Sequence, residues 1–276
     1  MEYLATQGIQ LPKLGLGTFR MPDDVCRPAV ESALALGYRH IDTAQMYDNE
    51  SAVGAAIGNA GVDRNALHIT TKVWNTNLAP DAIRRSFDTS LSKLKLDYVD
   101  LFLVHWPSAG MDLPAMFETL LRLREEGRTR AIGVANFTLP MLRTVVEGIG
   151  APLACNQIEY HPFLDQTPVY RYLRGHSIPL VAYCPLAQGN VAQDPVLQHI
   201  ADKHNASAAQ VALRWLLDQD GVAAIPKSQR AESQQANLDA LKLVLDDEDR
   251  RVIGALRKDQ RLVNPPFAPA WDAATE

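Results

Sequence analysis

Three apolar segments of the chain each carry a titratable side chain at or near their carboxyl end. The first ends on Asp42, with Tyr47 in the loop that follows it, the second carries Lys72, and the third ends on His105. Taken singly, each has an ordinary structural explanation, because aspartate caps turns and lysine extends to water. Together they form a set whose chemistry can be stated.

The four residue types suit the polarisation and protonation of a carbonyl group. A phenol has an ordinary pKa near 10, too high for efficient proton donation at neutral pH, and a neighbouring ammonium favours the phenolate. Lys72 could supply that charge to Tyr47, Asp42 would hold Lys72 in place, and His105 would orient the carbonyl oxygen. The set includes no usual nucleophile and no metal cage, so reduction needs a hydride from a cofactor.

The elements that would position these side chains follow a regular alternation. Short apolar segments alternate with amphipathic helical patterns, which predicts a parallel sheet. Counting Leu14–Gly17 as the first strand gives eight strands and an α/β fold, the (β/α)8 TIM barrel, in which adjacent strand ends are neighbours. The other predicted strands are Tyr38–Asp42, His68–Trp74, Tyr98–His105, Ala131–Ala135, Ala154–Glu159, Pro179–Cys184 and Val222–Pro226, and the clearest helices are Val25–Leu36, Asp81–Leu94, Pro114–Glu126, Pro168–Gly175 and Ala208–Gln219.

Local signals mark several helix ends. Thr167-Pro168 and Asp194-Pro195 each predict an N-cap followed by proline at the first helical position. The acidic run Asp246–Asp249 suits the start of a last helix. Gly37 and Gly127 suit helix C-terminal caps.

Composition narrows the classes of function. The chain has 276 residues, is 47% hydrophobic and 21% charged, and carries a net charge of −5 without a basic cluster. These values predict a globular protein with a sizeable core, and they argue against nucleic acid or an anionic membrane as a partner. The start of the chain lacks the features of a signal peptide, and three distant cysteines argue against disulfides or zinc. We therefore expect a cytoplasmic protein with no metal site.

No linker or composition shift divides the chain, so residues 1–276 are predicted to form one domain. Tyr3–Leu11 could form a hairpin at the bottom of the barrel, and Asn264–Trp271 is predicted to be an extended tail. A Rossmann fold is disfavoured, because the pair Gly15 and Gly17 lacks the third glycine of that fingerprint.

Several blocks of the sequence resemble the aldo-keto reductase superfamily. The blocks GYRHIDTAQMYDNE, TKVW, LVHWP, GVANF, NQIEYHP, AYCPL and IPKS occur in that family's order and extend over nearly the whole chain. The most similar members are of the bacterial 2,5-diketo-D-gluconate reductase type. The resemblance implies a (β/α)8 barrel that binds NADPH without a Rossmann motif, with Tyr47 as the general acid, assisted by Lys72 and Asp42, and His105 orienting the carbonyl.

The same resemblance implies the cofactor contacts. Asn136 and Gln157 would bind the nicotinamide carboxamide, and Tyr183 would stack on the nicotinamide ring. Lys227 and Ser228 would hold the adenosine 2′-phosphate. The remaining residues expected in the cofactor site are Gly17, Thr18, Cys184, Leu186, Arg230 and Asn237, the last of these at the adenine.

The chain departs from the family pattern at three positions of the cofactor site. Ala135 and Cys184 stand where serine is common, and Ser233 stands where many members have the arginine that grips the 2′-phosphate. Arg230 could replace that arginine, because a guanidinium suits phosphate. NADPH is therefore the expected cofactor, and NADH is the weaker alternative.

Aromatic residues beside the predicted polar set are expected to form the substrate pocket. They are Phe19, Trp74, Trp106 and Trp271. Apolar walls with few polar anchors would accept many aldehydes and small ketones, including diketo-sugar acids, methylglyoxal, β-keto esters and aromatic aldehydes. Two alternatives remain, a barrel hydrolase or lyase using Asp42 with Glu159, and a non-catalytic nicotinamide-nucleotide-binding regulatory barrel. A monomer is the default expectation.

Overall fold

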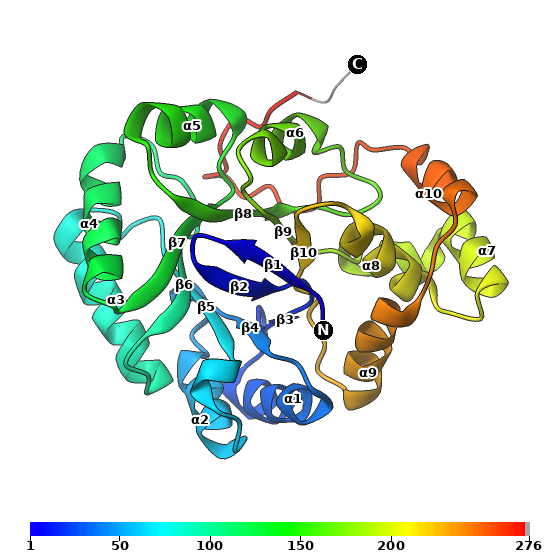
Figure 1. The fold of residues 1–276 in the computed structure, drawn as a ribbon, viewed down its shortest axis with the longest axis horizontal. Helices are drawn as coiled ribbons and strands as arrows, with labels where there is room; N and C mark the ends of the chain where they lie inside the picture. The colour runs from blue at the N-terminus through cyan, green and yellow to red at the C-terminus, as the bar shows by residue number, and fades with distance from the viewer. Residues whose placement is uncertain (274–276) are drawn as a thin grey trace.

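The computed structural model describes residues 1–273 and contains a curled eight-stranded sheet (Figure 1). Its strands follow sequence order, and every pairing between neighbours is parallel. The predicted α/β arrangement of eight parallel strands is confirmed. The strands are β3 (Leu16–Gly17), β4 (His40–Asp42), β5 (His68–Val73), β6 (Val99–Val104), β7 (Thr129–Ala135), β8 (Leu153–Glu159), β9 (Leu180–Tyr183) and β10 (Val222–Ala224).

Backbone hydrogen bonds also link the first and last strand segments. The amide of Gly15 donates to the carbonyl of Ala224 at 2.9 Å, and the amide of Ala224 donates to Lys13 at 2.7 Å. Two residues further along each segment, the amide of Gly17 donates to the carbonyl of Pro226 at 3.2 Å. The segments at the two ends of the strand order therefore lie side by side.

The helices lie outside the strands, as Figure 1 shows. The five predicted helices are present, with ends within about two residues of those expected. The pattern in the sequence did not mark α2, α5 or α9. The helices are α1 (Asp23–Leu36), α2 (Glu50–Asn59), α3 (Pro80–Leu94), α4 (Leu113–Glu125), α5 (Leu139–Arg143), α6 (Thr167–Gly175), α7 (Pro195–Lys203), α8 (Ala208–Asp218), α9 (Ala231–Asp239) and α10 (Asp247–Gly254).

Helix capping agrees with the sequence at one of the two predicted N-caps, and the acidic run marks the start of the last helix as expected. Asp194 caps α7, and Asp246 caps α10 through a reciprocal capping box. The prediction at Thr167 is wrong, because Thr167 is already the first residue of α6 and Gln166 occupies the cap position. The amide of Thr167 instead donates to the carboxylate of Asp165 at 2.9 Å.

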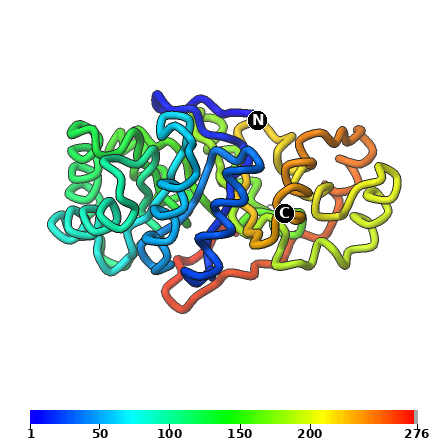
Figure 2. Tube along the Cα trace, turned by 90° about the horizontal axis from the view of Figure 1, so that it is seen from below, coloured from blue at the N-terminus to red at the C-terminus, as the bar shows by residue number. Residues whose placement is uncertain are grey.

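The two ends of the curled sheet are covered by different segments. The antiparallel hairpin of β1 (Tyr3–Thr6) and β2 (Ile9–Pro12) lies in the middle of the view in Figure 1. Figure 2 shows the red C-terminal segment on the opposite side of the molecule from this hairpin. The tail thus reaches the end of the sheet where the strands finish.

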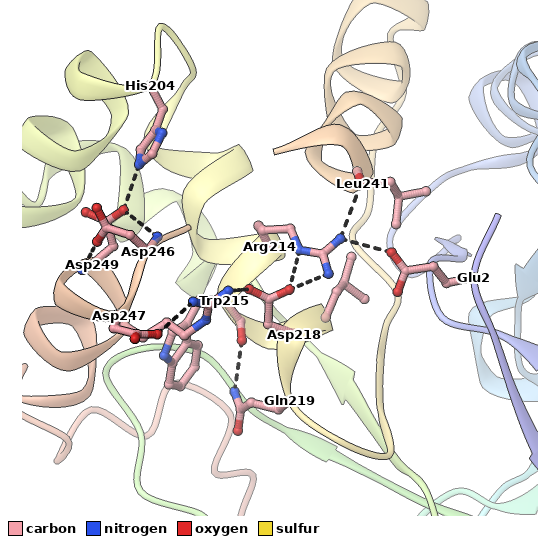
Figure 3. Close-up of polar contacts among 12 residues, drawn as sticks. Glu2, His204, Arg214, Trp215, Asp218, Gln219, Leu241, Asp246, Asp247 and Asp249 are labelled. Carbon is pink, nitrogen blue, oxygen red and sulfur yellow. Dashed lines mark hydrogen bonds and ion pairs between the residues drawn. The ribbon is translucent and has the colours of Figure 1, made fainter. Parts of the chain in front are cut away.

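Apolar side chains fill the space between the sheet and its helices, and a smaller cluster lies around α7, α8 and α10. Polar contacts and ion pairs link α8 and α10 to other parts of the chain (Figure 3). Arg214 of α8 joins Glu2, at 3.0 Å, to Asp218 of its own helix, and His204 contacts Asp249 of α10 at 2.7 Å. Within residues 1–273, no helix is long and apolar enough to cross a bilayer.

Candidate active site

Asp42, Tyr47, Lys72 and His105, which we call the polar quartet, meet at the carboxyl ends of β4, β5 and β6. The Lys72 Nζ atom lies 2.5 Å from Asp42 Oδ1 and 3.3 Å from Tyr47 Oη. Tyr47 Oη in turn lies 3.5 Å from Nε2 of His105. The structure thus brings all four predicted side chains around one phenolic oxygen.

The backbone and one buried amide hold the quartet in place. Lys72 also donates to the carbonyl of Thr43 at 3.0 Å, and Gln157 donates to the second oxygen of Asp42 at 2.7 Å. Tyr47 closes a short 3₁₀ turn, and Asp48 after it has a left-handed φ of 52°. This turn directs the tyrosine back over the end of the sheet.

The charges of the quartet follow from burial and pairing. Burial alone lowers the pKa of Lys72, but Asp42 and Tyr47 reverse this effect, so the pKa lies above its usual value and the amine stays charged. Burial raises the pKa of Tyr47, and although Lys72 lowers it, the net direction is upward. The sequence predicts that the charge of Lys72 favours the phenolate and so lowers the pKa of Tyr47. Lys72 has this effect, but the loss of water around the hydroxyl raises the pKa more, so the expected net lowering is wrong.

His105 is buried and neutral. Burial, and then the charge of Lys72, place its pKa well below the usual histidine value. In the part of the chain that the structure describes, its Nδ1 atom has no hydrogen-bond partner, and its ring meets the ring of Trp74 edge-on with centroids 5.2 Å apart. A neutral imidazole keeps one N–H that can donate to a carbonyl oxygen.

The residues expected at the nicotinamide adjoin the quartet and contact it. The side-chain Nδ2 of Asn136, a residue with a left-handed φ of 63°, donates to the backbone carbonyl of His105 at 2.9 Å. Tyr183 Oη donates to Asn136 Oδ1 at 2.8 Å. Together with the bond from Gln157 to Asp42, these contacts form a network that sequence reasoning did not foresee.

The residues expected at the cofactor phosphate lie at the end of β10 and the start of α9. Lys227 is exposed and donates to the carbonyl of Arg20 at 3.0 Å. Arg230, also exposed, lies 3.4 Å from the hydroxyl of Ser233, the position where the family often has arginine. Ser228 and Asn237 are buried beside them.

Four further predicted cofactor residues lie between these two groups. Thr18 is buried, and its amide and hydroxyl both donate to the carbonyl of Asp42 at 3.0 Å. Gly17 leaves no room for a side chain. Cys184, with a left-handed φ of 53°, and Leu186 are partly exposed just after β9.

Two of the predicted aromatic rings, Phe19 and Trp74, contact the quartet, and Trp106 and Trp271 pack further out, where the tail adds one more ring. The ring of Phe19 packs on the ring of Tyr47 with centroids 5.0 Å apart, and the rings of Trp271 and Trp106 have centroids 5.9 Å apart. Sequence reasoning missed Phe267, whose ring lies 5.4 Å from Trp74 and 5.5 Å from Trp106. Its place four residues before Trp271, in the same Pro-rich tail, was the available signal.

Comparison with known proteins identifies the family. A family model described as the aldo/keto reductase family matches residues 13–258. The chain belongs to the aldo/keto reductase family. This aldo/keto reductase is 47% identical over 266 residues to the methylglyoxal reductase DkgB of Salmonella typhi, covering 95% of this chain and 99% of that protein. It is 41% identical to the glyoxal reductase of Bacillus subtilis (strain 168), covering 92% of each chain.

Solved structures are similar to this aldo/keto reductase along its length. A structure described as a candidate 2,5-diketo-D-gluconic acid reductase B superposes with a TM-score of 0.96 at 40% identity, covering 99% of this chain and 98% of that one. MGS-M4, an aldo-keto reductase from a deep-sea metagenome library, gives a TM-score of 0.91 at 35% identity, with 95% and 97% covered. The predicted likeness to the 2,5-diketo-D-gluconate reductase type is thereby confirmed.

Proposed function

We propose that this aldo/keto reductase uses NADPH to reduce aldehydes and small ketones to alcohols. The observation that carries the proposal is the position of Tyr47 Oη, 3.3 Å from the ammonium of Lys72 and 3.5 Å from the imidazole of His105. The names of the relatives favour small dicarbonyls such as methylglyoxal and glyoxal. Diketo-sugar acids, β-keto esters and aromatic aldehydes remain further candidates.

Each member of the quartet has a defined task in this proposal. When bound, NADPH supplies the hydride from C4 of its nicotinamide. His105 donates a hydrogen bond to the substrate carbonyl and orients it, and Tyr47 gives its proton to the developing alkoxide. Lys72 stabilises the resulting phenolate, and Asp42 keeps Lys72 charged and in place.

The residues of this chain fit NADPH. Lys227 and Arg230 are exposed cations of the kind that bind phosphate, and Tyr183 presents a partly exposed ring beside Asn136. NADH remains the weaker alternative, because Ser233 replaces the usual arginine.

We further propose that residues 1–276 form one closed (β/α)8 TIM barrel that acts as a monomer in the cytoplasm. The backbone hydrogen bonds between the segments at Gly15 and Ala224 support closure, because they join the two ends of the strand order. Nucleic acid and membranes are not expected partners, since the net charge is −5.

The geometry does not favour the hydrolase or lyase alternative. Asp42 is buried, and its two carboxylate oxygens already accept hydrogen bonds, one from Lys72 and the other from Gln157. Glu159 is completely buried and accepts hydrogen bonds from the amides of Leu262 at 2.7 Å and Val263 at 3.0 Å, so it anchors the tail. A non-catalytic nucleotide-binding role remains the second candidate, and activity measurements decide between it and reduction.

Replacement of Tyr47 by phenylalanine tests the proposal. With methylglyoxal and a panel of aldehydes, the unmodified protein should oxidise NADPH, and Tyr47→Phe should lower kcat by about 100-fold or more, the usual contribution of a general acid. NADPH affinity, followed by fluorescence titration, should stay nearly unchanged. Near-normal turnover in the variant would refute the role of Tyr47, and no turnover of any carbonyl by the unmodified protein would favour the non-catalytic alternative.

A further inference from the structure

A cavity of about 510 Å³ opens at the end of the sheet opposite the quartet. The hairpin β1–β2 forms one wall, and the amino ends of β5, β6 and β7 with the turns before them form the rest. No member of the quartet lines it. Its polar and aromatic lining includes Tyr3, Arg39, His68, Tyr98, Asp100 and Arg130.

Two arginines bring positive charge to this amino-terminal cavity. Arg130 is exposed, and its guanidinium lies 4.3 Å from the ring centroid of Tyr98. Arg39 is half-buried and donates only to backbone carbonyls, those of Leu34 and Tyr38. Among the described residues, neither guanidinium has a carboxylate within ion-pair distance, so both keep donors for a ligand.

The carboxylate in the lining is already paired. Asp100 lies 2.7 Å from the guanidinium of Arg64 and accepts the amide of Ile69 at 2.9 Å. Asp100 thus offsets the charge of Arg64 mainly and that of Arg130 to a lesser extent, and one carboxylate facing Arg39, Arg64 and Arg130 leaves a surplus of positive charge. The net charge of the whole protein is −5, so the sign of the charge at this cavity is opposite to that of the protein as a whole.

A buried histidine at the cavity has an unpaired nitrogen among the described residues. His68 is 4% exposed and lines the cavity, yet its Nε2 atom has no hydrogen-bond partner within residues 1–273. Burial first, and then His40 and Arg64, hold the pKa of His68 well below its usual value, so the ring is neutral. A neutral imidazole nitrogen is suited to a hydroxyl group, which can both donate and accept.

We propose that the amino-terminal cavity binds a small hydroxylated organic anion. Arg39 and Arg130 would bind its oxyanion, carboxylate or phosphate, and Nε2 of His68 would bind its hydroxyl. Guanidinium groups are the preferred partners of both oxyanions. The site is distinct from the proposed NADPH and carbonyl site, so its occupation does not depend on that function.

Calorimetric titration tests this site, with glycerate, glycerol 3-phosphate and inorganic phosphate as probes at constant ionic strength. Glycerate and glycerol 3-phosphate distinguish the two kinds of oxyanion, and inorganic phosphate lacks the carbon-borne hydroxyl. We expect saturable binding of at least one hydroxylated anion, with or without NADPH present. Arg130→Ala should weaken it about tenfold, as the loss of one charge-assisted hydrogen bond predicts.

Two further variants make the result specific. Arg85→Ala removes an exposed arginine of α3 that does not line the cavity, and it should leave binding unchanged. His68→Leu should reduce the affinity for glycerol 3-phosphate to that for inorganic phosphate. If this variant does not fold, the affinity of Arg130→Ala still tests the proposed site. Absence of saturable binding, equal loss in Arg85→Ala, or displacement of the anion by NADPH would overturn the proposal.

Discussion

The protonation of Tyr47 is decided by two opposing effects within a few ångströms. Lys72 lies close enough to favour the phenolate, yet removal of the hydroxyl from water raises the pKa more than the ammonium lowers it. The phenol therefore carries its proton at neutral pH and is ready to give it up only when charge develops beside it. His105, with its lowered pKa, stays neutral over the same range.

These pKa directions predict the pH dependence of turnover. The acid form of Tyr47 is the active form in reduction, and its raised pKa keeps that form populated until the pH passes the ordinary phenol value of about 10. His105 loses its proton well below the ordinary value of about 6.5, so it adds no change at neutral pH. We expect kcat for reduction to be flat between about pH 7 and 9. A profile of kcat against pH that falls with a midpoint below about 8 would contradict this assignment.

The proposed role of Lys227 predicts a difference between cofactors. Lys227→Ala should raise KM for NADPH about tenfold, because a charge-assisted contact to the 2′-phosphate is lost, and it should change KM for NADH little. Lys242→Ala, which removes an exposed lysine paired with Asp239, is the matched control. Steady-state kinetics with both cofactors measure this, and equal effects on the two would show that Lys227 does not contact the phosphate.

Helix α2 packs against α3 through a glycine. A Cβ added at Gly54 would collide with the backbone carbonyl of Leu94, at the end of α3, whereas one added at Gly58, one turn further along α2, would meet nothing within 4 Å. Gly54→Ala should therefore lower the free energy of unfolding by about 1–3 kcal/mol.

Gly58→Ala provides the control on the same helix. It should raise the free energy of unfolding by up to about 1 kcal/mol, because alanine favours the helix and restricts the unfolded chain. Urea denaturation of both variants measures the two effects. Changes of the same sign would show that the contact with Leu94 does not decide the packing of α2.

The C-terminal tail is held by polar contacts at two places. Glu159 at the end of β8 accepts the amides of Leu262 and Val263, and the carboxylate of Asp272 accepts the amide of Leu139 at the start of α5 at 2.9 Å. Between these two anchors the tail packs Phe267 on Trp74 and Trp106, and Trp271 on Trp106. An apparently loose Pro-rich segment thus becomes one wall of the proposed substrate pocket.

At the scale of the whole molecule, the meeting of the first and last strand segments depends on a small residue. A Cβ at Gly17 would lie 2.7 Å from the carbonyl of Ile225, at the point where these segments exchange hydrogen bonds. Gly17→Ala should lower the free energy of unfolding by about 1–3 kcal/mol through overpacking.

Gly148→Ala is the control, because a Cβ there meets nothing within 4 Å. Chemical denaturation followed by circular dichroism measures both variants. Equal stability of Gly17→Ala and the unmodified protein would show that the two segments can separate at that point without loss, which would contradict the proposed closure of the barrel.

The sequence alone determined the alternation of strands and helices and which side chains stand at the strand ends. Both depend on local patterns, since periods of 2 and 3.6 residues, capping residues and turn residues act over a few positions. Asp42, Lys72 and His105 could be assigned to one end of a parallel sheet because all parallel strands end on the same side. The predicted cap at Thr167 is wrong because the helix begins one residue earlier than expected, so Thr167 is its first residue and its amide donates to Asp165.

Only the tertiary structure decided which buried groups pair. The bonds from Gln157 to Asp42 and from Tyr183 to Asn136, and the packing of Phe267 on the tryptophans, join residues tens to hundreds of positions apart. The direction of the Tyr47 pKa also depends on how completely its hydroxyl is withdrawn from water. Such effects depend on distance and dielectric environment in three dimensions, which no local pattern encodes.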